Sequence, residues 1–130
     1  MEQVLRKLTL EFFGKGRHKI SPEEFFNLDA GVLLDVRAEE EVATLAFRLE
    51  HHRNIEVLNI PLDQLPARLG EVPRGKAVAL FCSAGVRAAI GYAYLLEQGY
   101  PEARILEGGY APVVDALKPG KLLKVLESRE

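Results

Sequence analysis

Apolar residues follow two alternating patterns along this chain. Short apolar runs suit strands that are buried on both faces of a sheet. The predicted strands lie at residues 18–20, 32–34, 56–60, 77–81 and 103–106. Helical spacing of apolar side chains predicts helices at residues 2–13, 22–29, 39–52, 62–69, 87–98, 111–117 and 121–129. Because strands alternate with helices, we expect an α/β fold with a mostly parallel central sheet and helices on both faces.

Helix boundaries are marked by individual residues. Ser21 is placed to cap the helix that follows it, Pro22 suits the first helical position, and Glu24 completes a capping box. Gly14 and Gly99 are expected to end the helices that precede them. The acidic run at 39–41 is expected to be a solvated first helical turn.

Composition narrows the possible classes of protein. The chain has 130 residues, 48% of them hydrophobic and 28% charged, with a formal net charge of −2. This length fits one domain. Lys and Arg are neither in excess nor clustered, so we expect no nucleic-acid partner. The apolar runs are shorter than the roughly 20 residues that span a bilayer, and charges interrupt the N-terminal segment, so we expect no membrane partner and a cytoplasmic location.

The chain contains one cysteine, Cys82, which excludes an intramolecular disulfide and a cysteine-based metal cluster. Three histidines, His18, His51 and His52, lack the spacing of metal ligands and are expected at the surface. The sequence therefore predicts no metal site.

Cys82 follows the predicted strand at 77–81 and precedes the predicted helix that opens at Arg87. Ligands of open α/β sheets bind at the carboxyl ends of the strands, which is where this cysteine falls. The intervening residues, 83–86, are small or flexible and predict a loop that curls around one point. Gly85 permits backbone angles that other residues resist.

A helix N-terminus offers unpaired amide groups and a dipole that favours negative charge. A cysteine sulfur held there is expected to exist largely as the thiolate, the nucleophilic form. Arg87 adds a fixed positive charge and a planar donor fork for an anionic substrate. The alternative is that Cys82 is an inert core residue, because cysteines at strand ends are often buried. The small-residue loop and the arginine that follow favour the working thiol.

The hexapeptide CSAGVR at 82–87 resembles the active-site loop of the rhodanese family, whose pattern is often C-x-x-G-x-R. Four more segments resemble the family and occur in its order: ISPEE at 20–24, LLDVR at 33–37, NIPL at 59–62 and LEGGY at 106–110. The resemblance implies a three-layer sandwich and divides the chain into an N-terminal helical extension (1–17), a rhodanese-like domain (18–117) and a C-terminal helical tail (118–130). The chain lacks the family's usual G-H-I-x-G-A segment at residues 53–58, so we expect that edge of the sheet to differ.

The resemblance also implies an activity. A single-domain sulfurtransferase of this type takes sulfane sulfur from a donor such as thiosulfate onto Cys82 as a persulfide. It then passes the sulfur to cyanide, a cellular thiol or a sulfur-relay protein, with no metal or organic cofactor. Arg87 is implied as the second catalytic residue, and the implied substrate-binding residues are Ser83, Ala84, Gly85, Val86 and Arg87.

Asp35 and Arg37 stand two residues apart at a strand end, so both side chains point the same way. One alternative is a catalytic role. The resemblance favours a structural role in which the pair braces neighbouring loops, and ion pairs near sites often serve only as scaffolding.

Three other functions stay open. Cysteine-based phosphatases and arsenate reductases pair Cys with Arg in a C-x5-R loop, whereas the sixth residue after Cys82 is Ala88 and the arginine is the fifth. A non-catalytic rhodanese-like binding module is the second, although such modules usually lack the cysteine. The third is a carrier that receives sulfur from a partner protein.

Overall fold

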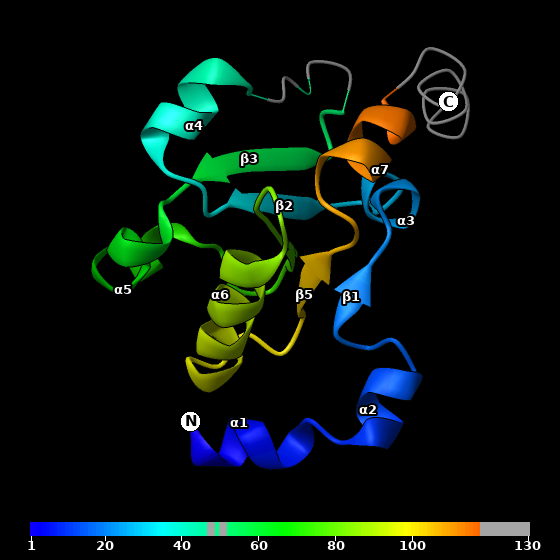
Figure 1. The fold of residues 1–130 in the computed structure, drawn as a ribbon, viewed down its shortest axis with the longest axis vertical. Coiled ribbons are helices and arrows are strands. Elements are labelled where there is room, and N and C mark those ends of the chain that lie inside the picture. Colours follow the sequence, from blue (N-terminus) through cyan, green and yellow to red (C-terminus); the bar gives the residue numbers. More distant parts are fainter. Residues whose placement is uncertain (47–48, 50–51, 118–130) are drawn as a thin grey trace.

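Five parallel strands form the centre of the structure (Figure 1). The computed structural model describes residues 1–46, 49 and 52–117. The strands are β1 (Lys19–Ile20), β2 (Gly31–Asp35), β3 (Ile55–Asn59), β4 (Ala77–Phe81) and β5 (Ala103–Leu106). Their order is β1-β5-β4-β2-β3, and every pairing is parallel. The predicted parallel α/β sheet is confirmed.

Strands β2 and β4 are apolar at every position except Asp35, because both of their faces are covered. All five residues of β2 are buried. Leu33 and Leu34 point to opposite faces, as successive strand residues do, and belong to two different hydrophobic clusters. Across the β2–β4 pairing, Leu34 is in register with Leu80, and Leu33 with Ala79. Each face of the sheet therefore has its own core.

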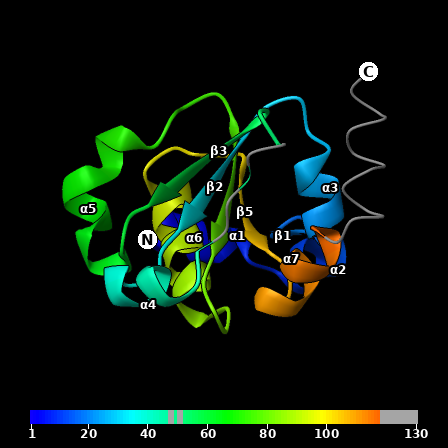
Figure 2. The same cartoon turned by 90° about the horizontal axis from the view of Figure 1, so that it is seen from above.

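Helices cover both faces, so the described residues form three layers (Figure 2). On one face lie α5 (Leu65–Arg68), flanked by 3-10 turns at Leu62–Gln64 and Leu69–Glu71, and α6 (Val86–Glu97), against which α1 (Glu2–Lys7) packs. On the other face, α3 (Pro22–Phe26) packs with α7 (Tyr110–Ala116). The short helices α2 (Leu10–Gly14) and α4 (Glu39–Thr44) complete the set. The expectation of helices on both faces is confirmed.

The N-terminal segment differs from its prediction. Residues 2–13 form two helices, α1 and α2, in place of one. Thr9 interrupts the pattern because its backbone is extended and its hydroxyl accepts a hydrogen bond from the Phe12 amide at 3.1 Å. A threonine in this position caps a new helix and does not continue the old one. Helix α1 rests on the domain, since Val4 is buried and the Met1 amino group lies 2.8 Å from the Glu97 carboxylate, and Phe12 of α2 packs partly buried against the same core.

Two other helices are shorter than predicted. The helix predicted at 22–29 ends at Phe26, and the one predicted at 39–52 ends at Thr44, where Leu45 becomes extended. Residues 47–48 and 50–51 lie outside the described residues, as does the tail predicted to be helical at 121–129. The predicted cap at Ser21 is present, because its hydroxyl accepts a hydrogen bond from the Glu24 amide at 3.2 Å. Among the residues that the structure describes, no helix is both long and apolar enough to cross a bilayer.

The prediction that His52 lies at the surface is wrong. Its side chain is only 2% exposed, and its ring centroid lies 5.0 Å from that of Phe26. The neighbouring Asn54 amide group donates hydrogen bonds to the carbonyl oxygens of Phe26 and Leu28. The segment at 53–58, which lacks the family's G-H-I-x-G-A pattern, therefore packs through Asn54 on the chain that leads into β2. Strand β3 keeps its full register with β2. His51 lies outside the described residues.

Candidate active site

Cys82 directly follows β4 and precedes α6, at the carboxyl end of the sheet. Its side chain is 3% exposed and forms part of the core on the α6 face. The loop after it turns at Gly85, whose φ of +89° lies in the left-handed region. Glycine adopts this conformation without the clash that a Cβ causes, so the loop closes on the sulfur after only three residues.

Two backbone amides point at the Cys82 sulfur. The Gly85 amide donates to Sγ at 3.0 Å, and the Ala88 amide donates at 3.3 Å. Donors at a helix N-terminus stabilise negative charge on the atom that they face. The sequence predicted amides from residues 83–87. The described contacts to Sγ include Gly85 of that set and add Ala88, which the expectation of a loop ending at Arg87 missed.

Arg87 lies at the mouth of this loop, and its guanidinium is held by the carboxylate of Glu41. Nη1 lies 2.5 Å from Oε1, and Nη2 lies 2.9 Å from Oε2, so the pair is bidentate. Nη2 also donates to the Ser83 hydroxyl at 3.3 Å. The two charged side chains are 35% and 36% exposed. Arg87 therefore has a carboxylate partner that the sequence did not identify.

The Glu41–Arg87 contact changes the ionisation of both groups. The hydrogen bonds from Arg87, followed by that from the Ala38 amide, lower the pKa of Glu41 from 4.5 to about 2. Hydrogen bonding to Glu41, with the charges of Glu41 and Cys82 adding to it, raises the pKa of Arg87. Glu41 was expected to lie in a solvated helical turn. It does lie in the first turn of α4 and is 36% exposed, and its carboxylate also contacts the arginine of the cysteine loop.

Asp35 and Arg37 form a buried ion pair behind the loop. Arg37 is 0% exposed, Asp35 is 4% exposed, and the shortest contact joins Arg37 Nη2 to Asp35 Oδ2 at 2.6 Å. Arg37 Nη1 donates to the Leu45 carbonyl oxygen and to the Tyr110 hydroxyl, each at 2.8 Å. The guanidinium also lies 5.1 Å from the ring centroid of Phe81. One side chain thus connects the end of α4, the end of β4 and the start of α7, a position that suits the expected structural role.

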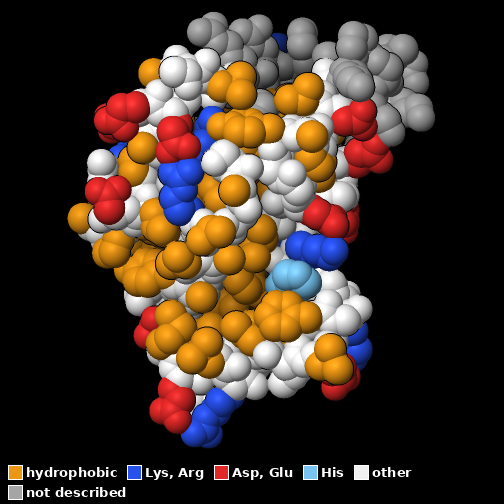
Figure 3. Space-filling view, in the orientation of Figure 1, with side chains coloured by type: hydrophobic (Ala, Val, Ile, Leu, Met, Phe, Trp, Pro, Cys, Tyr) orange, Lys and Arg blue, Asp and Glu red, His pale blue; other side chains and the backbone are white. Residues whose placement is uncertain are grey.

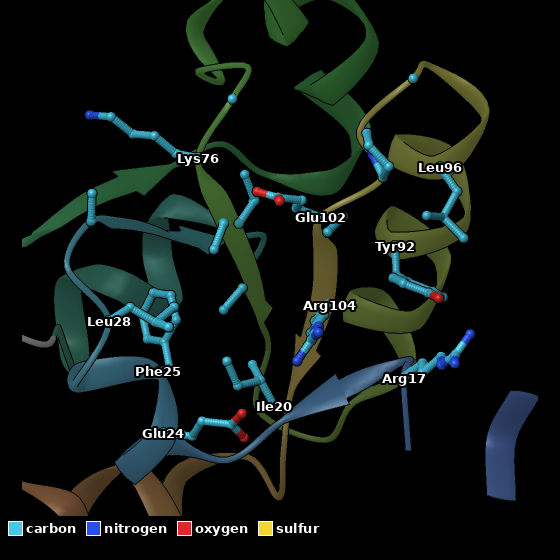
Figure 4. Close-up of a pocket in the computed structure, with 18 of the residues that line it drawn as sticks. Arg17, Ile20, Glu24, Phe25, Leu28, Lys76, Tyr92, Leu96, Glu102 and Arg104 are labelled. Atoms are coloured by element: carbon cyan, nitrogen blue, oxygen red, sulfur yellow. The ribbon is translucent and has the colours of Figure 1, made fainter. Parts of the chain in front are cut away.

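A cavity of 1130 Å³ lies away from Cys82, at the amino ends of β4 and β5 (Figure 4). Its walls come from α1, α3 and α6 as well as from the sheet, and neither Cys82 nor Arg87 lines it. The polar groups around it have both signs, for example Arg17, Arg104, Glu24 and Glu102. The cysteine loop and this cavity therefore lie at opposite ends of the sheet.

Metal-binding clusters are absent from residues 1–46, 49 and 52–117. Within these ranges, no group of three or more His, Cys, Asp or Glu side chains is placed to hold a metal ion.

Curated relatives of this chain are sulfurtransferases. A sulfurtransferase of Allochromatium vinosum is 31% identical over 78 residues, which cover 60% of this chain and 66% of that protein. A tRNA sulfurtransferase of Yersinia pestis is 31% identical over 77 residues, which cover 59% of this chain but 15% of that protein. The chain therefore spans less than two thirds of each of these relatives.

Solved structures of other proteins share this fold. A rhodanese-related protein from Thermoplasma volcanium has a TM-score of 0.62 and 25% identity, and the match covers 78% of this chain and 95% of that one. A NAD-dependent persulfide reductase from A. fulgidus has a TM-score of 0.58 and 33% identity, with 78% of this chain and 17% of that chain covered. The family model of the rhodanese-like domain matches residues 22–116. Since this match covers more than half of the chain, the chain belongs to the family of rhodanese-like domains.

Proposed function

We propose that this protein is a sulfurtransferase that carries sulfane sulfur as a persulfide on Cys82. The observation that carries the proposal is the convergence of the Gly85 and Ala88 amides on Sγ, at 3.0 and 3.3 Å. Oriented amides at a helix N-terminus stabilise a thiolate before the reaction and a persulfide anion after it. The sulfurtransferase relatives support the same reaction class.

The first half-reaction is proposed to use a sulfane-sulfur donor, and thiosulfate serves to write it out. The Cys82 thiolate attacks the outer sulfur of thiosulfate, the S–S bond of the donor breaks, and sulfite leaves with the electron pair. The products are the Cys82 persulfide anion and sulfite, so atoms and charge balance. In the second half-reaction, cyanide or a thiolate attacks the outer sulfur of the persulfide and regenerates the Cys82 thiolate.

The remaining residues of the loop are proposed to bind the donor. Arg87 supplies a positive charge at the loop, since its guanidinium contacts the Ser83 hydroxyl within the loop itself. Ser83, Ala84 and Val86, the other members of the loop, are proposed to contact the donor, and Val86 is 67% exposed. Asp35 and Arg37 are proposed to brace this arrangement from behind.

A carrier that receives or delivers sulfur through a partner protein is the second candidate. Val86 and Ile90 lie on the outer side of α6 beside the loop and are 67% and 56% exposed. Figure 3 shows hydrophobic side chains gathered on the face that carries α5 and α6. Exposed apolar groups beside a reactive atom favour a protein partner over a small ion.

The test is to incubate the protein with thiosulfate, remove the small molecules and measure its intact mass beside that of Cys82→Ser. We expect the mass of one added sulfur atom, absent in the variant and lost on treatment with cyanide. If a folded protein whose Cys82 reacts with a thiol reagent gains no mass, thiosulfate is not the donor. The experiment is then repeated with a second protein that carries a persulfide as the donor. A gain of one sulfur atom on Cys82 supports the carrier, and no gain rejects it.

A further inference from the structure

The Glu41 carboxylate occupies the guanidinium of Arg87, which is the positive charge of the site. Both terminal guanidinium nitrogens of Arg87 are engaged by the Glu41 carboxylate, at 2.5 and 2.9 Å, and one of them also contacts Ser83. Bidentate pairing uses the same planar fork that recognises an oxyanion. An anionic donor therefore meets an arginine whose two terminal nitrogens already make three hydrogen bonds within the chain.

The ionised side chains at the loop add to one net negative charge when Cys82 is a thiolate. A Cys82 thiolate and the Glu41 carboxylate contribute two negative charges, against one positive charge on Arg87. The Asp35–Arg37 pair behind the loop is neutral as a unit, since its two charges lie 2.6 Å apart at the closest atoms. Coulomb energy is proportional to the charge of the approaching donor. A dianion is therefore repelled about twice as strongly as a monoanion.

We propose that Glu41 is a specificity-determining residue that selects donors of low negative charge over dianions. The favoured class comprises monoanionic or neutral donors such as thiosulfonates and alkyl persulfides, and the disfavoured class is represented by thiosulfate. This inference rests on the proposed sulfur transfer through Cys82. For a thiosulfonate, the thiolate attacks the terminal sulfur, the S–S bond breaks, and a sulfinate leaves with the electron pair, so that the persulfide forms with the same net charge.

The test compares Glu41→Gln with the wild-type protein on two donors, thiosulfate and methanethiosulfonate, with cyanide as acceptor. In a double-displacement reaction, kcat/KM for the donor reports only the first half-reaction. In Glu41→Gln we expect kcat/KM to rise about 10-fold for thiosulfate and about 3-fold for methanethiosulfonate. The logarithm of this rise is proportional to the charge of the donor, and thiosulfate carries twice the charge of methanethiosulfonate. Added salt should raise the wild-type value for thiosulfate more than that of the variant, because salt screens the repulsion.

The matched control is Glu40→Gln. It removes the same charge from the neighbouring position of α4, where the side chain is exposed and, among the described residues, makes no hydrogen bond or ion pair. We expect both donors to change equally and little in this control. An equal change for the two donors in Glu41→Gln, or a loss of activity with both, overturns the inference, because Glu41 then only positions Arg87. If neither protein forms a persulfide with either donor, the proposed function itself has failed.

Discussion

Gly109 lies against the backbone of Ser83 so closely that a Cβ built on Gly109 would be 2.6 Å from the Ser83 carbonyl oxygen. Its φ is +72°, a conformation that side-chain-bearing residues rarely adopt. The turn between β5 and α7 therefore supports the first residue after the candidate catalytic cysteine. Only glycine permits this approach.

Gly109→Ala is expected to push the Ser83 backbone out of place. We expect an unfolding free energy lower by about 1–3 kcal/mol, since both the clash and the positive φ act on the folded state. Sulfur transfer should slow in the same variant. Urea unfolding and donor kinetics measure the two effects. Gly70→Ala is the control, because a Cβ on Gly70 would have no atom within 4 Å and the φ of Gly70 is not positive. Equal stability and equal rates in the two variants would contradict the expectation.

Gly85→Ala separates backbone strain from loss of the sulfur contact. Gly85 has a φ of +89° and open space around its Cβ position, so alanine costs about 1–2 kcal/mol through the backbone alone. Relaxation of that strain turns the amide away from Sγ, and we expect persulfide formation to slow by about 10- to 100-fold.

Gly75→Ala is the matched control for Gly85→Ala, because Gly75 also has a positive φ, +83°, and no atom near its Cβ position. It should lose similar stability and keep the wild-type transfer rate. A Gly85→Ala variant with the rate of Gly75→Ala would show that the amide contact is dispensable.

Arg37→Met is expected to lower the unfolding free energy by about 3–5 kcal/mol, because it leaves the Asp35 carboxylate buried without its cation. Tyr110→Phe removes only the hydroxyl that accepts from Arg37 and should cost about 1–2 kcal/mol. Urea unfolding measures both changes in unfolding free energy. The control is Arg6→Ala, which breaks an exposed pair with Glu2 and should change stability little. A small effect of Arg37→Met would argue against the bracing role.

The Glu41 contact predicts a pH dependence. Pairing with Arg87 lowers the folded pKa of Glu41 to about 2, from 4.5. A carboxyl group with a lowered folded pKa contributes stability that is complete above its unfolded pKa and is lost as pH falls through the folded value. The stability difference between wild type and Glu41→Gln should therefore be constant above pH 4.5 and shrink toward pH 2. Urea unfolding across this range measures it, and a difference that persists unchanged at pH 2 would contradict the ion pair.

Much of the fold follows from short stretches of sequence. The runs at 32–34 and 77–81 predicted buried strands because a strand covered on both faces needs apolar residues at every position, and β2 and β4 lie there. Ser21 and its acidic neighbours predicted a helix start because capping depends on residues close in sequence. Such features need no knowledge of the tertiary structure.

Helix ends and burial were harder to predict. A periodic pattern over 2–13 does not reveal whether Thr9 continues one helix or caps the next, because its hydroxyl serves either arrangement. His52 has a polar side chain in a polar stretch of sequence, and only its packing against Phe26, far away in the sequence, makes it a buried residue. The local signal was therefore ambiguous at Thr9 and was overridden by long-range packing at His52.

By itself, the sequence determined that a lone cysteine, a loop of small residues and an arginine follow a buried strand, because these residues are consecutive. Tertiary structure alone decided what surrounds them. Glu41 reaches Arg87 across 46 residues of chain because β2 and β4 pair in parallel, which brings their carboxyl ends, and the helices that follow, to the same edge. Contacts of this kind depend on strand order, and no local pattern of residues encodes that order.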